Sequence, residues 1–214
     1  RRGAVRIGRG AAVQHAVAVR RDVPDGLLVM QLADELAVAA FEQLQLDQVQ
    51  LLPAAQPWQR DALGASTQDR LAMAELAAQR HPGLQVNPVE IERGGPTYTI
   101  DTVRSLPAGS RYYWILGSDQ LHNFCSWNDW QEILEYVELA VAQRPGSPVE
   151  TPEALQQELS RLQRRLHQID FLPMDISATQ IRERVQRGDN ITALVPEEVA
   201  QYIDKKRLYL SHPQ

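Results

Sequence analysis

The sequence predicts an α/β fold with a mainly parallel sheet and helices on both of its faces. Short apolar runs alternate along the chain with longer segments whose apolar residues recur at helical spacing. Several of the short runs are apolar at every position, which is typical of strands covered on both faces. Gly and Pro separate the two kinds of segment, and the 214 residues suffice for one domain with its own core.

In the first half of the chain, the expected alternation of strands and helices begins with an apolar run at 13–19, which predicts a short strand. Residues 27–44 predict a helix, because Leu28, Leu32 and Leu36 follow the i, i+4, i+8 spacing of an amphipathic face. The elements expected next are a strand at 49–53, a helix at 67–80 with Thr67 as its N-cap, and an extended segment at 84–91.

The second half continues the same alternation. Thr151 and Pro152 suit the N-cap and first position of a helix, and Gly188 suits the C′ position that ends one. The helices expected here are at 99–106, 127–137, 152–167, 177–187 and 196–203, and the strands at 112–116, 139–142 and 169–172.

Charge and cysteine content exclude several classes of protein. Lys and Arg total 22 against 27 Asp and Glu, a net charge of -5, which argues against broad binding to nucleic-acid backbones. Cys125 is the only cysteine, so neither an internal disulfide nor a zinc site with several thiolates can form. The longest apolar runs fall well short of the ~20 residues of a membrane span. We therefore expect a soluble, cytoplasmic protein with no resident metal and no nucleic-acid or membrane partner.

The N-terminal segment departs from this average. Six of its first 22 residues are Arg, and Asp22 is the only acidic one. A basic N-terminal arm is favoured over a transit peptide, because such peptides are rich in Ser and the first Ser here is Ser66. The expected organisation is an atypical basic segment at 1–26 and a single domain at 27–214, whose small C-terminal helical part covers about 177–210.

A first candidate site lies where the helix at 177–187 begins. Ser177 with Gln180 three residues on forms a capping box, which explains those two residues structurally. It does not explain Thr179 or Arg182. A helix N-terminus with two hydroxyls and a guanidinium one turn on is also a phosphate site, and local physics leaves both interpretations open.

Further candidates follow the other predicted strands. Two glycines and a proline precede Tyr98 and Thr99 at a helix start, although capping by Thr99 and Thr102 is the ordinary explanation of such hydroxyls. Gly117 and Asp119 follow an apolar strand, where open parallel sheets bind ligands.

Two indoles and one arginine complete the set of candidates. Trp127 and Trp130 are three apart, so that one can pack in the core while the other offers a flat face to an aromatic ring. Packing in the core is the ordinary role of either indole alone. Arg144 ends a strand beside a rigid Pro-Gly turn, where a surface ion pair is the structural alternative.

In this order and spacing the pieces resemble the bacterial nicotinate-mononucleotide adenylyltransferases, members of the nucleotidyltransferase α/β phosphodiesterase superfamily. The resemblance runs from about residue 32 to 209. It rests on Gly-Pro-Thr-Tyr-Thr-Ile-Asp-Thr at 95–102, Leu-Gly-Ser-Asp at 116–119, Trp127, Arg-Pro-Gly at 144–146 and Ile-Ser-Ala-Thr-x-Ile-Arg at 176–182. The last motif alone also suits pantetheine-phosphate or glycerol-phosphate nucleotidyltransferases, but the other pieces favour the pyridine-nucleotide enzymes.

The resemblance implies a Rossmann-like fold and a reaction in NAD biosynthesis. Nicotinate mononucleotide would attack the α-phosphorus of ATP, which arrives with Mg2+, to give nicotinate adenine dinucleotide and pyrophosphate. By the same resemblance, Gly117, Asp119, Ser177, Thr179 and Arg182 would bind ATP. The mononucleotide would be bound by Tyr98, Thr99, Trp127 and Arg144.

One part of the family pattern is missing. The family carries a Gly-Gly-x-Phe-Asp-Pro-x-His-x-Gly-His signature after its first strand, whose histidines stabilise the transferring phosphoryl group. Residues 18–28 read AVRRDVPDGLL, without His-x-Gly-His, so no residue of this chain is assigned as catalytic. The alternatives to an active enzyme are an inactive mononucleotide-binding protein of the same fold and an α/β scaffold whose hydroxyls only cap helices.

Overall fold

Six parallel strands form one sheet in the computed structural model, which describes residues 14–18, 27–53, 65–144, 146, 148–171 and 178–210. The strands are β1 (Gln14–Ala18), β2 (Gln48–Leu51), β3 (Leu84–Val86), β4 (Arg111–Gly117), β5 (Glu138–Gln143) and β6 (His167–Asp170). Their order is β3-β2-β1-β4-β5-β6, and each neighbouring pair is parallel. The predicted α/β, Rossmann-like fold is therefore confirmed. The order reverses between β1 and β4, which makes their carboxyl ends the expected binding position.

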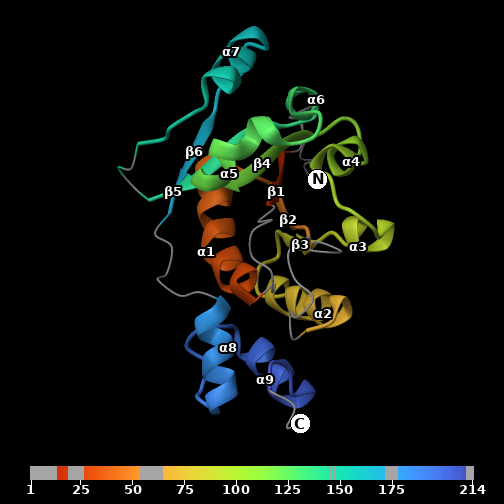
Figure 1. Cartoon of the computed structure of the whole chain (residues 1–214), viewed down its shortest axis with the longest axis vertical. Coiled ribbons are helices and arrows are strands. Elements are labelled where there is room, and N and C mark those ends of the chain that lie inside the picture. Colours follow the sequence, from red (N-terminus) through yellow and green to blue (C-terminus); the bar gives the residue numbers. More distant parts are fainter. Residues whose placement is uncertain are drawn as a thin grey trace, which may run out of the picture.

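Helices cover both faces of the sheet (Figure 1). They are α1 (Leu27–Leu44), α2 (Thr67–Ala78), α3 (Val89–Arg93), α4 (Thr99–Arg104), α5 (Ser118–Asn123), the 3-10 turn η1 (Phe124–Ser126), α6 (Trp130–Tyr136), α7 (Glu153–Arg161), α8 (Ala178–Arg187) and α9 (Glu197–Lys206). Figure 1 shows α7 at one end of the long axis and α8 with α9 at the other. No helix among the described residues is long and apolar enough to cross a membrane.

Strand β4 separates two cores, because successive side chains of a strand point to opposite faces. Trp114 and Leu116 belong to a cluster that includes residues of α4, α5, α6 and α7. Tyr113 and Ile115 belong to a second cluster with residues of α1 and α2. The central strand is thus buried on both faces, as its uninterrupted apolar run predicts.

The C-terminal helices pack on α2 rather than on the sheet. Ile181 of α8 and Ile203 of α9 share an apolar cluster with Met73 of α2. The Tyr202 hydroxyl donates to Asp69 Oδ1 at 2.9 Å, which joins α9 to the start of α2. Helix α8 also contacts α1.

Several element boundaries differ from the sequence prediction. The N-cap of α2 is Ser66 rather than Thr67, and it forms a capping box with Asp69. The extended segment predicted at 84–91 ends at β3, and α3 follows it. Helix α6 begins at Trp130 instead of residue 127, because Asp129 has a left-handed φ of 49° that interrupts the helix.

The helix predicted at 152–167 also ends early. Gln163 has a φ of 54°, and the Arg164 backbone N–H donates to the Leu159 carbonyl at 2.9 Å. A left-handed residue followed by this bond is the pattern that terminates helices. Helix α7 therefore stops at Arg161, and His167 is free to begin β6.

Candidate active site at the carboxyl edge of the sheet

Gly117 ends β4 next to the switch point of the sheet. Its backbone is extended, with φ -82° and ψ 167°, and a Cβ added there would meet no atom of the described residues within 4 Å. No described residue therefore fills the space beside the strand end. Asp119 lies in the first turn of α5, is exposed, and its carboxylate has no hydrogen-bond or ion-pair partner among the described residues.

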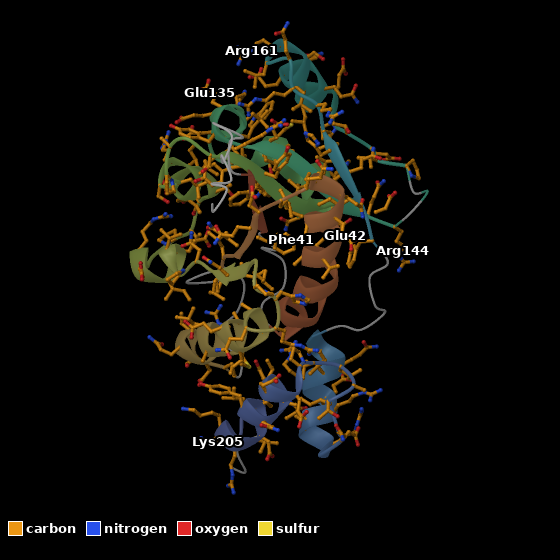
Figure 2. The ribbon with its side chains drawn as sticks, turned by 180° about the vertical axis from the view of Figure 1, so that it is seen from behind. Phe41, Glu42, Glu135, Arg144, Arg161 and Lys205 are labelled. Carbon is orange, nitrogen blue, oxygen red and sulfur yellow. The ribbon has the colours of Figure 1, made fainter. Side chains whose placement is uncertain are left out.

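Arg144 follows the end of the neighbouring strand. Gly117 pairs with Ala142 in the β4–β5 ladder, so Arg144 lies two residues beyond the level of Gly117. The guanidinium is exposed, and Figure 2 shows it projecting from the side of the molecule. Within the described part of the chain it has no ion-pair partner, so the surface ion pair considered as its structural role is not found there.

The start of α4 holds the next two candidates. Gly94 and Gly95 both have left-handed φ, 65° and 70°, a conformation that glycine adopts without strain. The turn leads to Tyr98, which is 43% exposed, and to Thr99, which is 2% exposed. The buried Thr99 hydroxyl has no hydrogen-bond partner among the described residues.

Capping by the threonines, the ordinary explanation of this cluster, is wrong. The N-cap of α4 is Tyr98, and it makes no side-chain capping bond. The Thr102 hydroxyl instead donates to Glu90 Oε1 at 2.9 Å, a contact that joins α4 to α3. Glu90 is 1% exposed, so this is a buried contact.

Trp127 and Trp130 flank the turn before α6. Both are partly buried and pack against Phe124, with ring centroids 5.0 Å and 6.2 Å from its ring. Neither indole is fully enclosed, so the division into one core and one exposed tryptophan does not hold. Trp127 is the nearer of the two to α5 along the chain.

Helix α8 carries the remaining described candidates. Arg182 donates from Nη2 to Thr179 Oγ1 at 3.1 Å, which draws the guanidinium toward the start of the helix. Ser177 lies outside the described residues, and with it the predicted capping box. Figure 1 shows α8 well separated along the long axis from α4, α5 and α6. The candidates on α8 thus lie apart from those on α4 and α5, and Figure 2 shows Arg144 at a third position, on the opposite side of the view from α4.

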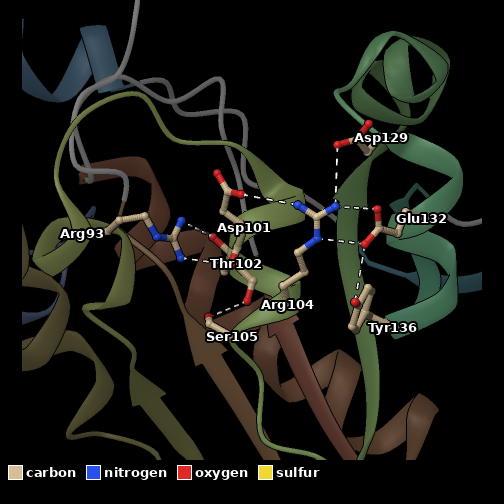
Figure 3. A network of polar contacts seen from close by, with 8 residues as sticks. All are labelled: Arg93, Asp101, Thr102, Arg104, Ser105, Asp129, Glu132 and Tyr136. Carbon is tan, nitrogen blue, oxygen red and sulfur yellow. Dashed lines mark hydrogen bonds and ion pairs between the residues drawn. The ribbon is translucent and has the colours of Figure 1, made fainter.

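A polar network between α4 and α6 could not be predicted from the sequence. Arg104 of α4 forms a bidentate pair with Glu132 of α6, at 2.8 Å from Nε to Oε1 and 2.5 Å from Nη2 to Oε2 (Figure 3). The hydrogen bond with Glu132 raises the pKa of Arg104, and the same bond lowers the pKa of Glu132. The two residues are 28 positions apart, so no local pattern points to their contact.

Comparison with known proteins decides the family. Residues 35–184 match the family model of cytidylyltransferase-like proteins. The chain is 55% identical over 174 residues to the “Probable nicotinate-nucleotide adenylyltransferase” of Bordetella pertussis, covering 81% of this chain and 88% of that protein. The chain belongs to the nicotinate-nucleotide adenylyltransferase family. A member from Methylibium petroleiphilum is 35% identical over 181 residues, covering 81% of this chain and 84% of the relative.

Solved structures of adenylyltransferases share the fold. The Plasmodium falciparum nicotinic acid mononucleotide adenylyltransferase complexed with NaAD has a TM-score of 0.64 at 13% identity. The match covers 92% of this chain and 97% of that one. The identities with the Bordetella and Methylibium relatives confirm the adenylyltransferase resemblance predicted from the motifs and the expected class, a nucleotidyltransferase family of NAD biosynthesis, and the solved structure shows the shared fold.

Proposed function

We propose that the carboxyl edge of the sheet binds nicotinate mononucleotide and ATP and joins them. A phosphate oxygen of the mononucleotide attacks the α-phosphorus of ATP. The bond from that phosphorus to the bridging oxygen of the β-phosphate breaks, and pyrophosphate leaves together with Mg2+. The observation that carries the proposal lies at the carboxyl ends of β4 and β5: Gly117 has no described atom within 4 Å of an added Cβ, and the exposed side chains of Asp119 and Arg144 have no partner among the described residues.

The mononucleotide side of the site is proposed to involve Tyr98, Thr99, Trp127 and Arg144. The buried Thr99 hydroxyl lacks a partner within the described structure, so a polar ligand atom would satisfy it. Trp127 offers an indole face to the pyridine ring. The Arg144 guanidinium is suited to a carboxylate or phosphate, since it presents paired donors to either anion.

The ATP side is proposed to involve Gly117 and Asp119 with Ser177, Thr179 and Arg182 of the α8 region. Gly117 leaves room for the nucleotide, and a helix start with hydroxyls and a guanidinium suits phosphates. Mg2+ belongs to the substrate, because it enters bound to the triphosphate. This chemistry needs no covalent intermediate, so these residues act by alignment and charge neutralisation.

A specific observation also favours a second function. Residues 18–28 lack the His-x-Gly-His that the family uses on the transferring phosphoryl group. Loss of one preplaced donor at such a site costs about 10²–10³ in rate. The chain as written would then be a mononucleotide-binding protein with turnover several orders of magnitude below that of family members that have the signature.

The test combines calorimetry with a pyrophosphate-release assay on the purified chain, using ATP, Mg2+ and either nicotinate or nicotinamide mononucleotide. Binding of nicotinate mononucleotide with turnover supports the enzyme, and binding without pyrophosphate supports the second function. Binding of neither ligand contradicts both.

Replacing residues 18–28 with Gly-Gly-Thr-Phe-Asp-Pro-x-His-x-Gly-His is expected to raise turnover. Arg182→Ala is expected to weaken ATP binding more than mononucleotide binding, and an equal loss of both would count against its assigned role.

A further inference from the structure

Arg104 joins two segments that carry different walls of the proposed mononucleotide pocket. It lies in the last turn of α4, the helix that begins at Tyr98 and Thr99. Its bidentate partner Glu132 lies in the first turn of α6, five residues after Trp127. The ion pair therefore spans from the Tyr98 side of the pocket to the Trp127 side.

The Arg104 network, defined as Arg104, Asp101, Asp129, Glu132 and Tyr136, places one cation among three carboxylates (Figure 3). Besides the bidentate pair, Arg104 Nη1 lies 3.9 Å from Asp101 Oδ1, and Nη2 lies 3.9 Å from Asp129 Oδ2. The Tyr136 hydroxyl donates to Glu132 Oε1 at 3.5 Å. Removal of the guanidinium would therefore leave like charges facing one another across the two segments.

The network reaches the turn that presents Trp127. Asp129 has φ 49° and ψ 40°, a left-handed conformation that is uncommon for residues other than glycine and depends on its surroundings. Its carbonyl accepts from the Ile133 N–H at 3.1 Å, and its carboxylate faces Arg104. The conformation of residues 127–129 is therefore coupled to the position of α4.

Each of the two segments is also held from its outer side. On the α4 side, Arg93 donates from Nη2 to the Asp101 carbonyl at 3.2 Å and from Nη1 to Thr102 Oγ1 at 3.4 Å. On the α6 side, Arg164 donates to the carbonyls of Leu134, Glu135 and Val137 at the end of the helix. These contacts fix α4 to α3 and α6 to the chain after α7, whereas the Arg104 network spans between the two.

We propose that Arg104 is a positioning residue for mononucleotide recognition, which sets the spacing between Trp127 and the Tyr98–Thr99 pair without touching the ligand. The inference rests on the proposed function for the identity of the ligand. It separates the two substrates, because Thr179 and Arg182 lie on α8, away from the network. The other described ATP candidates, Gly117 and Asp119, belong to β4 and α5, which contribute no residue to the network. Loss of Arg104 therefore weakens the mononucleotide and spares ATP.

The test compares Arg104→Ala with a matched control, Arg161→Ala. Arg161 makes a similar bidentate pair with Glu158, at 2.9 Å and 2.6 Å, but both partners lie within α7. Figure 2 shows Arg161 at the far end of the molecule from Lys205, on the protruding helix. Calorimetry measures the affinities for nicotinate mononucleotide and for ATP, and the unfolding midpoint is recorded for each variant.

Arg104→Ala is expected to bind the mononucleotide about fivefold more weakly, as the loss of a well-formed surface pair implies, with ATP affinity unchanged. Arg161→Ala leaves both affinities unchanged. The charge swap Arg104→Glu with Glu132→Arg restores most of the lost affinity. Unchanged mononucleotide affinity in Arg104→Ala, or an equal loss for both ligands with a lowered midpoint, would overturn the inference.

Failure of the proposed function gives a different result. If the unmodified chain binds no mononucleotide, the proposed function fails, and amide hydrogen exchange of the ligand-free protein decides the positioning role. Faster exchange at 97–102 and 127–130 in Arg104→Ala than in the unmodified chain supports the role. Unchanged exchange in both segments overturns it.

Discussion

The two edges of the sheet differ in whether their polar and charged side chains have partners among the described residues. At the amino edge, Arg111, Glu138 and His167 begin three adjacent strands and bind one another. Arg111 Nε donates to Glu138 Oε1 at 2.7 Å, and His167 Nε2 lies 2.7 Å from Glu138 Oε2. The Tyr113 ring meets the His167 ring edge-on, with centroids 5.1 Å apart. These three side chains therefore find their polar partners within the protein.

At the carboxyl edge the same strands end in groups that the described structure leaves unmatched. Asp119 and Arg144 are exposed without a partner among the described residues, and no atom of those residues lies within 4 Å of a Cβ added at Gly117. Because both edges belong to the same strands, their difference does not come from the fold alone. In the proposed function, the amino edge serves stability and the carboxyl edge receives the ligand.

The largest expected effect comes from filling the open space at Gly117. Its φ of -82° is accessible to any residue, so Gly117→Val is expected to fold with little change in unfolding midpoint. A misfit at the proposed ATP site is expected to weaken ATP binding on the order of 100-fold. Calorimetry with ATP and thermal unfolding measure the two quantities. Retained ATP affinity would mean that this space does not receive the nucleotide.

A tenfold effect is expected for Trp127, with Trp130 as its matched control. Loss of a stacked aromatic contact is expected to weaken mononucleotide binding about tenfold in Trp127→Ala. Trp130 packs on the same Phe124 ring, so Trp130→Ala controls for the packing that is lost. Indole fluorescence and calorimetry measure binding. Equal losses in the two variants would assign Trp127 to the core instead of the pocket.

A smaller effect is expected for Arg144. Because the side chain is exposed and lacks a described partner, Arg144→Ala is expected to change the free energy of unfolding by less than about 0.5 kcal/mol. Mononucleotide affinity is expected to fall about fivefold, since a charge-assisted contact is removed. Titration calorimetry measures the mononucleotide affinity, and denaturant unfolding measures the free energy of unfolding. A loss of stability without a loss of affinity would mean that Arg144 has a structural role, as the paired side chains of the amino edge do.

The amino edge is expected to show the reverse pattern, with no effect on ligand affinity. Glu138→Gln is expected to lower the free energy of unfolding at pH 7 by about 1–2 kcal/mol, because hydrogen bonds to a charged group are lost. Mononucleotide affinity should stay unchanged in calorimetry. A loss of affinity without a loss of stability would contradict the claim that the amino edge serves stability and not ligand binding.

The pH dependence of stability gives a second measure of the same edge. Burial acts to raise the pKa of Glu138, but the hydrogen bonds from His167 and Arg111 outweigh it and hold the pKa below the ordinary value of 4.5. A carboxyl group with a lowered folded-state pKa adds stability above its unfolded value, and this stability is lost as pH falls through the folded pKa. Unfolding free energy should therefore drop below pH 4.5 more steeply in the unmodified chain than in Glu138→Gln.

The strands and the longer helices could be predicted because their signals are local. The 18 residues of α1 match the predicted bounds, since its apolar spacing runs the whole length. Strand β4 is buried at five of its seven positions, which its apolar run anticipates. By contrast, the extended segment predicted at 84–91 overlaps α3, and no helix is predicted at α5, because helices of five and six residues depend on tertiary packing.

In the candidate site, too, residues in local motifs could be predicted and contacts between distant residues could not. Motifs placed Gly117, Asp119 and Arg144 at the ends of strands, where adjacent parallel strands necessarily present them at one edge. The Arg104–Glu132 contact and the buried Glu90–Thr102 contact join residues 28 and 12 positions apart, and no periodicity or turn residue marks them. Left-handed Asp129 was missed for a related reason, since aspartate only tolerates that conformation and does not signal it.

Amide hydrogen exchange with and without nicotinate mononucleotide tests the difference between the two edges most directly. We expect the ligand to slow exchange in the segments that form the carboxyl edge and its surroundings, at 97–102, 117–121, 127–130 and 142–144. Exchange at the amino edge, around Arg111, Glu138 and His167, should stay the same. Protection confined to the amino edge, or no protection anywhere at saturating mononucleotide, would contradict the assignment of the carboxyl edge as the binding site.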